Sequence, residues 1–184
     1  ERGIIIEGAE SLQQTVSAVT TNIDDLAKEP PDVIVITVKA NALPLIMSVY
    51  LGVAETAARR ARDKCASSKD PVTPYLLGEM ENALTTAELS VRDMIATVDE
   101  FQFTADIATV NEIVKRKTIA AEACKQTVAK AGEACGGPGF LRSGGIESLL
   151  RDVQASHFHP LQEKRQLLVT GSLAKGQQPP AQAV

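Results

Sequence analysis

Apolar residues recur every three or four positions along most of this chain, and that spacing constrains its fold more than any other feature. The clearest stripe follows Pro71 and ends at Val98, with mainly charged and polar residues at the positions in between. This period matches the turn of an α-helix, so it predicts an amphipathic helix that buries one face. The apolar positions of this helix are Leu77, Met80, Leu84, Ala87, Val91, Met94 and Val98.

Two further stripes of the same kind flank this helix in the sequence. One begins at Pro44 and ends before the polar segment from Ser67 to Pro71, where the proline cannot continue a helix. The other follows Asp99 and Glu100 and is interrupted once, where Lys117 falls on the apolar side. Three long antiparallel helices are therefore predicted. The outer stripes contain Ile46, Val49, Val53, Ala57 and Ala61, and then Ile107, Val110, Val114, Ala121, Cys124, Val128, Ala131 and Cys135.

Shorter helices are predicted after the third long one. The segment Gly136 to Gly139 ends that helix, because glycine accepts positive φ at a helix C-terminus and the proline stops continuation. Helices are then expected from Ile146 to Ala155 and from Leu161 to Leu173, separated by a corner of sequence His157-Phe158-His159-Pro160. We therefore predict an all-α protein, an up-and-down four-helix-type bundle with a C-terminal helical arm.

The two ends of the chain carry weaker patterns. Near the start, Gly3 to Ile6 and Val33 to Val38 have the composition of strands, whereas Leu12 to Leu26 has helical spacing. The predicted organisation is a poorly defined N-terminal segment (1–35), a helical bundle domain (36–173) and a disordered tail (174–184).

Composition argues against several classes of protein. With 3% aromatic residues and no Trp, the core must be built from Ala, Leu, Ile and Val, which suits close-packed helices. A net charge of -4 leaves no basic surplus for a phosphate backbone, so nucleic acid is not an expected partner. The three cysteines form no CxxC pair, which predicts buried reduced thiols rather than disulfides or a metal site.

The longest apolar run, from Val33 to Val53, does not make a membrane span. Lys39, Asn41 and Pro44 interrupt it, and we expect a cytoplasmic protein without a membrane segment. Because the first residue is Glu rather than Met, the sequence is expected to begin inside a longer product, whose start would carry any targeting signal.

The most specific stretch runs from Gly136 to Arg142 and continues from Ile146 to Asp152. It resembles the acyl-CoA dehydrogenase family, in which a long helix ends at a Gly-Gly-x-Gly-Phe/Tyr turn and a Leu-x-Arg-Asp helix follows. The resemblance covers Pro44 to Gly171 and implies the C-terminal helical domain of such a flavoprotein, with residues 1–35 as a remnant of the middle domain. It also takes in Tyr50-Leu51-Gly52-Val53-Ala54, Gly78-Glu79-Met80 and Glu88-Leu89.

The resemblance implies FAD as the cofactor and a fatty acyl-CoA as the substrate. In the family a carboxylate removes the α-proton while N5 of FAD accepts hydride from the β-carbon. The glycine turn lies against the FAD pyrophosphate of a neighbouring subunit, so a homo-oligomer, either a dimer or a tetramer, is expected. The matching cofactor-binding residues are Glu133, Gly136 and Gly137, although the family usually has Gln in place of Glu133. A further contact of the family, an Arg-x-Thr-Phe segment, has no counterpart in Ser67 to Tyr75.

The catalytic base of the family has no direct match. The family places a Glu just after the Arg-Asp helix, which falls on or near Pro160, or on the first helix beside the residues matching Ala42 to Pro44. The nearest acid after the corner is Glu163. Some relatives are flavin monooxygenases that use a His near this corner to manage a flavin (hydro)peroxide, which makes His157 and His159 candidates.

Three functions therefore remain open for the sequence. The first is the C-terminal part of an acyl-CoA dehydrogenase-type enzyme, in which case the isolated chain is expected to be inactive because its substrate and flavin pockets are incomplete. The second is a monooxygenase-type relative. The third is a non-catalytic helical module that serves oligomerisation.

Overall fold

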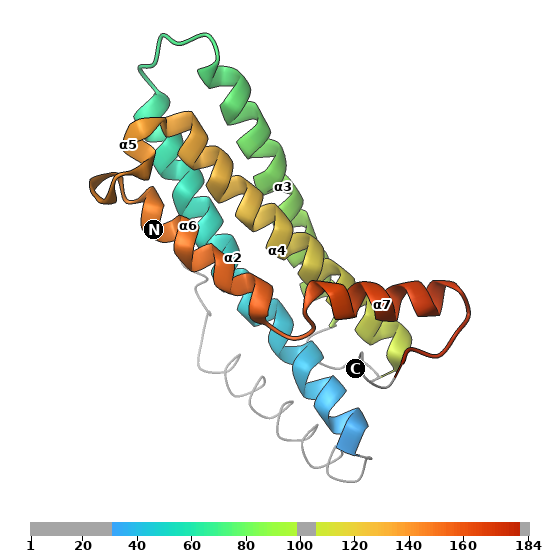
Figure 1. Ribbon diagram of the computed structural model, residues 1–184. Coiled ribbons are helices and arrows are strands. Elements are labelled where there is room, and N and C mark those ends of the chain that lie inside the picture. Colours follow the sequence, from blue (N-terminus) through green and yellow to red (C-terminus); the bar gives the residue numbers. More distant parts are fainter. Residues whose placement is uncertain (1–30, 99–105, 181–184) are drawn as a thin grey trace.

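The computed structural model describes residues 31–98 and 106–180, and within these ranges it consists of helices and their connections (Figure 1). Three long helices form the body: α2 (Pro31–Cys65), α3 (Thr73–Thr97) and α4 (Ile107–Cys135). Helix α4 makes the most extensive contacts, first with α3 and then with α2. The three predicted long helices are confirmed. No helix in the described ranges is long and apolar enough to cross a membrane.

The remaining elements follow the glycine turn and complete the bundle. They are α5 (Gly137–Phe140), η2 (Arg142–Gly144), α6 (Ile146–Val153), η3 (Gln154–Phe158) and α7 (Glu163–Ala174). Helix α6 packs against α4 and α2, while α7 crosses α4 near the other end of the bundle (Figure 1). The all-α bundle with a C-terminal arm is thus confirmed, although α7 begins two residues later than predicted.

Helix α2 corrects one of the sequence expectations. It begins at Pro31, so Val33 to Val38 lie in a helix and the strand alternative for them is wrong. A short apolar run of β-branched residues does not distinguish a strand from a buried helix. Pro44 lies inside α2 rather than at its start, and its side chain is fully buried. The predictions for Gly3 to Ile6 and Leu12 to Leu26 fall outside the described residues.

The core is made mainly of small side chains. Four alanines of α2 are completely buried and pack with residues of α3, α4 and α6, which brings the helices close together. The cysteines are free and buried, as predicted, and burial raises the pKa of the Cys124 thiol to about 12. The four alanines are Ala54, Ala57, Ala58 and Ala61.

Helix α4 contacts both parts of the site described below, and its two ends are defined in different ways. At the start, Asp106 Oδ1 accepts hydrogen bonds from the backbone N–H groups of Ala108 (2.9 Å) and Thr109 (3.0 Å). Such a side-chain cap satisfies N–H groups that have no partner in the first helical turn. At the other end the helix stops at Gly136.

Candidate functional site

The first part of the candidate site is the glycine turn at the end of α4. Gly136 has φ 62° and ψ -153°, a conformation that residues with a Cβ rarely adopt, and its N–H donates to the carbonyl of Glu133 at 3.0 Å. The prediction that glycine ends this helix is confirmed.

Glycines around this turn fall into two groups. A Cβ added at Gly139 would lie 2.7 Å from the carbonyl oxygen of Gly132, and one added at Gly144 would lie 2.2 Å from that of Pro138. These two glycines therefore allow close approach within the chain. At Gly136 and Gly137, in contrast, an added Cβ would meet no atom within 4 Å. The bare backbone of these two residues faces open space.

Glu133 lies one turn before the glycines and is engaged in an ion pair. Its Oε2 is 3.0 Å from Lys130 Nζ, and the same ammonium is 2.7 Å from Glu79 Oε2. Hydrogen bonds to Glu79 and then to Glu133 raise the pKa of Lys130. The negative charge next to the turn is thus partly balanced by a lysine of the same helix.

The second part of the site is the corner between η3 and α7, residues 157–160. Lys117 of α4 reaches this corner, and its Nζ donates to the carbonyls of His159 (3.0 Å) and Leu161 (3.2 Å). The side chain is buried, which confirms its predicted place on the apolar side of α4. Burial lowers the pKa of Lys117, with a smaller lowering by Lys125 and an opposite effect of Glu163.

The two histidines of the corner have different surroundings. His159 Nε2 lies 2.7 Å from Tyr50 Oη on α2, and the two rings pack at a centroid distance of 5.4 Å. Burial raises the pKa of Tyr50. This contact holds the His159 side chain against α2.

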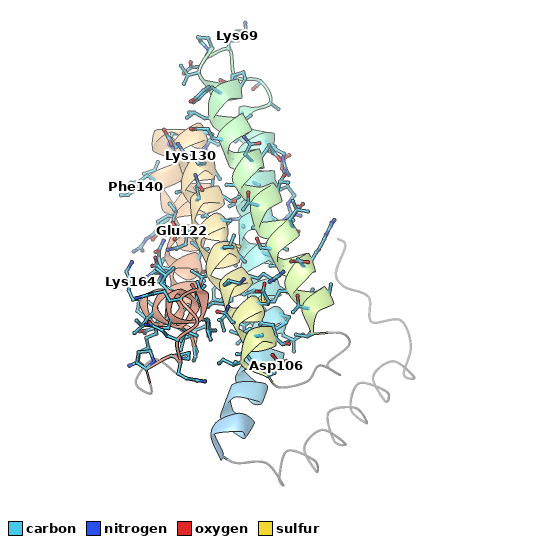
Figure 2. All side chains as sticks on the ribbon, turned by 90° about the vertical axis from the view of Figure 1, so that its right-hand side faces the viewer. Lys69, Asp106, Glu122, Lys130, Phe140 and Lys164 are labelled. Atoms are coloured by element: carbon cyan, nitrogen blue, oxygen red, sulfur yellow. The ribbon has the colours of Figure 1, made fainter. Side chains whose placement is uncertain are left out.

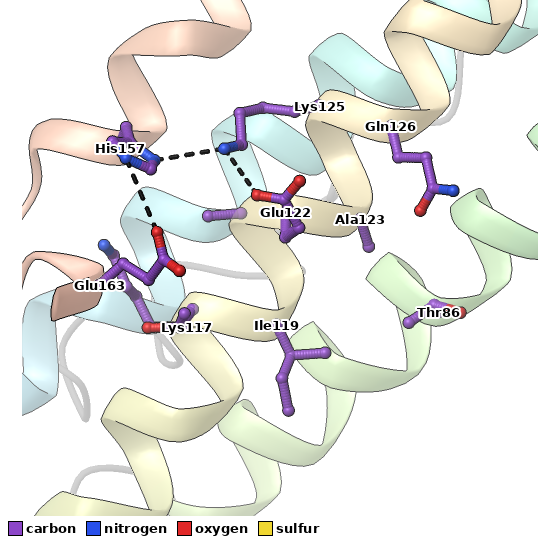
Figure 3. Close-up of a pocket in the computed structure, with 11 residues that line it drawn as sticks. Thr86, Lys117, Ile119, Glu122, Ala123, Lys125, Gln126, His157 and Glu163 are labelled. Atoms are coloured by element: carbon purple, nitrogen blue, oxygen red, sulfur yellow. Dashed lines mark hydrogen bonds and ion pairs between the residues drawn. The ribbon is translucent and has the colours of Figure 1, made fainter. Parts of the chain in front are cut away.

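His157 instead lines a cavity of about 330 Å³ on the surface of α4, together with Glu163 (Figure 3). The Nε2 atom of His157 is 3.9 Å from Glu163 Oε2, and Nδ1 is 3.2 Å from Lys125 Nζ. Lys125 also pairs with Glu122 at 2.6 Å. The pKa of Glu163 is lowered, mainly by its hydrogen bond with Lys164.

The structure therefore brings together two of the three predicted catalytic candidates, His157 and Glu163, and separates His159 from them. The cofactor-binding candidates Glu133, Gly136 and Gly137 lie at the C-terminal end of α4, whereas the cavity lies against the middle of that helix. In the described ranges, no group of three His, Cys, Asp or Glu side chains is placed to hold a metal ion.

Sequence reasoning did not select Tyr50, Lys117 or Lys125 as site residues. Lys117 did carry a signal, because a lysine on an apolar stripe needs hydrogen-bond partners inside the fold. Tyr50 and Lys125 gave no sign in the sequence of being site residues. Tyr50 contacts a histidine 109 residues away, and Lys125 contacts one 32 residues away.

Comparison with known families agrees with this architecture. The sequence profile of the family described as acyl-CoA dehydrogenase, C-terminal domain, matches residues 46–163, which is more than half of the chain. The chain belongs to this family. The matched region extends from the middle of α2 through the glycine turn and the corner to the first residue of α7. Comparison with curated proteins finds no significant match, and neither does comparison with solved structures.

Proposed function

We propose that this chain is the C-terminal helical domain of an FAD-dependent acyl-CoA dehydrogenase-type oxidoreductase, which desaturates an acyl-CoA thioester between its α and β carbons. The observation that carries the proposal is the open space beside Gly136 and Gly137, within the region that matches the family. Gly137 has neither a positive φ nor a close neighbour. A ligand from outside the described chain would account for the absence of its side chain.

The turn fits the diphosphate of FAD in its chemistry. Backbone N–H groups that are not covered by side chains bind phosphate oxygens well, and Gly137 would hold the group in this way. Gly136, whose own N–H donates to Glu133, would leave room for the group beside it. Glu133 opposes an anion by its charge, but its pairing with Lys130 reduces that repulsion. When bound, FAD supplies the hydride acceptor of the reaction.

For removal of the α-proton we propose the pair of His157 and Glu163 in place of the glutamate of the family. Both side chains line one cavity and their nearest polar atoms are 3.9 Å apart, so a group bound in the cavity would meet both of them. Since the ammonium of Lys125 can only donate to Nδ1 of His157, the neutral ring would carry its proton on Nε2, toward Glu163. The carboxylate of Glu163 would then accept the α-proton, and His157 would orient that carboxylate.

The proposal is tested by the visible absorption spectrum of the purified longer parent protein, before and after anaerobic addition of a panel of acyl-CoA thioesters. Bound flavin that is bleached by a thioester is the expected result. Absence of flavin would contradict the proposal and favour a helical oligomerisation module.

A second candidate function is a flavin monooxygenase-type relative. It is favoured by the imidazole of His157 at the cavity and by Pro160 at the position expected for a glutamate. Under this alternative the bound flavin stays oxidised when thioesters are added without oxygen, so the same spectra separate the two candidates.

We further propose that the domain forms homo-oligomers, a dimer or a tetramer. Phe140, just after the glycine turn, is 79% exposed and points outward from the bundle (Figure 2), and Leu141 beside it is 56% exposed. Apolar side chains at this exposed turn suit contact with another subunit. Light scattering of the parent protein measures the oligomeric state, and a monomer would contradict this part of the proposal.

A further inference from the structure

Lys117 is the largest fully buried side chain in the described part of the chain, with 2% of its surface exposed. Among the described residues, no carboxylate lies within ion-pair distance of its ammonium group, although the pKa of Lys117, which burial lowers, is raised slightly by the negative charge of Glu163. Burying an ammonium group costs free energy that hydrogen bonds only partly recover. A methionine of similar shape would avoid this cost, so stability alone does not explain a lysine here.

The partners of Lys117 explain it better. Its Nζ binds the carbonyls of His159 and Leu161, which lie on either side of Pro160. Tyr50 binds the side chain of His159 from α2. The corner is thus held at three points by two helices of the bundle.

The residues held in this way stand next to the proposed catalytic pair. His157 lies two positions before the first of these carbonyls, and Glu163 lies two positions after the second. Such short spacers limit how far either side chain can move from the cavity while the carbonyls stay in place. Lys117 itself contributes to the wall of that cavity.

We propose that Lys117 is a positioning residue, whose hydrogen bonds to the carbonyls of His159 and Leu161 place the pair of His157 and Glu163 against the cavity. This role rests on the proposed function, because it matters to a reaction only if the pair takes part in one.

The first test measures the corner itself and does not depend on activity. Lys117→Met is compared with the parent protein by amide hydrogen exchange of residues 154–163. Loss of both hydrogen bonds should speed exchange there by about tenfold, while α3 and α4 stay unchanged. The control is Lys115→Met, on the same helix but with a side chain that is 34% exposed. Unchanged exchange at the corner in Lys117→Met would overturn the inference.

The second test separates positioning from simple support of the fold. In the flavin-loaded parent protein, Lys117→Met should slow flavin reduction by an acyl-CoA thioester about tenfold to a hundredfold, with thioester affinity changed less than about twofold. Lys117→Arg, which keeps a cationic donor, should recover part of the rate. Faster exchange with an unchanged rate, or equal rates for the Arg and Met variants, would overturn the positioning role.

Two outcomes remain to be separated. If the unaltered parent protein shows no flavin reduction by thioesters, the proposed function fails, and the exchange experiment alone decides whether Lys117 holds the corner. If circular dichroism shows that Lys117→Met is unfolded, Lys117→Gln replaces it in both tests, because its neutral amide is one bond shorter than lysine and cannot keep both hydrogen bonds at their present length.

Discussion

The glycine turn follows the C-terminal end of α4, the corner packs against the middle of the same helix, and the two are built in opposite ways. At the turn, Gly136 and Gly137 leave the backbone bare, and no atom of the described chain occupies the space where a Cβ would be. At the corner, Tyr50 of α2 binds the side chain of His159, and Lys117 of α4 binds the backbone carbonyls of His159 and Leu161. The turn is open to a group from outside, whereas the corner is fixed by the bundle. This difference teaches that a segment proposed to bind a cofactor and a segment proposed to place reactive side chains can depend on different kinds of support.

The largest effect is expected at the corner, on the chemical step. Glu163→Gln in the longer parent protein should lower the rate constant for flavin reduction by a thioester about a hundredfold, as loss of a general base commonly does. Stopped-flow absorbance measures this rate. His157→Ala should act in the same direction, because its ring lies beside this carboxylate. If His159→Ala were the more harmful variant, the distinction between the two histidines would be wrong.

A second prediction tests the close packing behind the glycine turn. Gly144→Ala should reduce the free energy of unfolding by about 2 kcal/mol, because the new Cβ would lie 2.2 Å from the carbonyl oxygen of Pro138. Urea denaturation of the chain measures this loss. Gly78→Ala is the control, since it adds a Cβ in open space within α3 and is expected to stabilise the chain by up to about 1 kcal/mol. Equal effects of both substitutions would contradict the structure of the turn.

A third prediction concerns the buried thiol of Cys124, whose neighbours in α4 line the cavity. The folded pKa of Cys124 is about 12, whereas an unfolded thiol has a pKa of about 8.5. Its contribution to stability is therefore fully present below about pH 8.5 and is lost as the pH rises toward 12, which amounts to about 2 kcal/mol at pH 10. Cys124→Ala should reduce the loss of stability between pH 8 and about pH 10. If the free energy of unfolding fell with pH equally in Cys124→Ala and in the unaltered protein, the thiol would not be shielded from water.

A fourth prediction tests the openness of the turn. Gly137→Val in the parent protein should weaken FAD binding at least about tenfold, or about 1.4 kcal/mol, because a branched side chain would occupy the space beside the diphosphate. Fluorescence titration of the flavin-free protein measures the affinity. The matched control is Gly171→Val in α7, where an added Cβ also meets open space. Unchanged FAD affinity in Gly137→Val would refute the assignment of the diphosphate to this turn.

The smallest effect is expected for the contact that ties the corner to α2. Tyr50→Phe should lower the free energy of unfolding by about 1 kcal/mol, since it removes one partly buried hydrogen bond to His159. Tyr75→Phe provides the control, because Tyr75 is 68% exposed on α3. Equal denaturation curves for the two variants would mean that α2 does not help to fix the corner.

The difference between local patterns and contacts of distant residues explains which features could be predicted from the sequence. The long helices were predictable because stripes such as Leu77 to Val98 are local patterns, and the end of α4 was predictable because Gly136 needs a positive φ. The beginning of α2 was missed, since a proline inside a helix looks like a helix start. The corner could not be assembled from the sequence, because its contacts join residues far apart in the chain. The predicted tail and the domain limits stay predictions.

The buried alanines of α2 have a consequence for how this domain can change. A core of large side chains is damaged mainly by truncation, which leaves cavities. At Ala57, Ala58 and Ala61, which are 0% exposed, there is almost nothing to truncate, and the harmful direction is growth. Each added methyl group would have to push two helices apart along their length. The domain therefore tolerates loss of volume at these positions better than gain. A larger side chain there would widen the spacing between α2 and the helices packed against it.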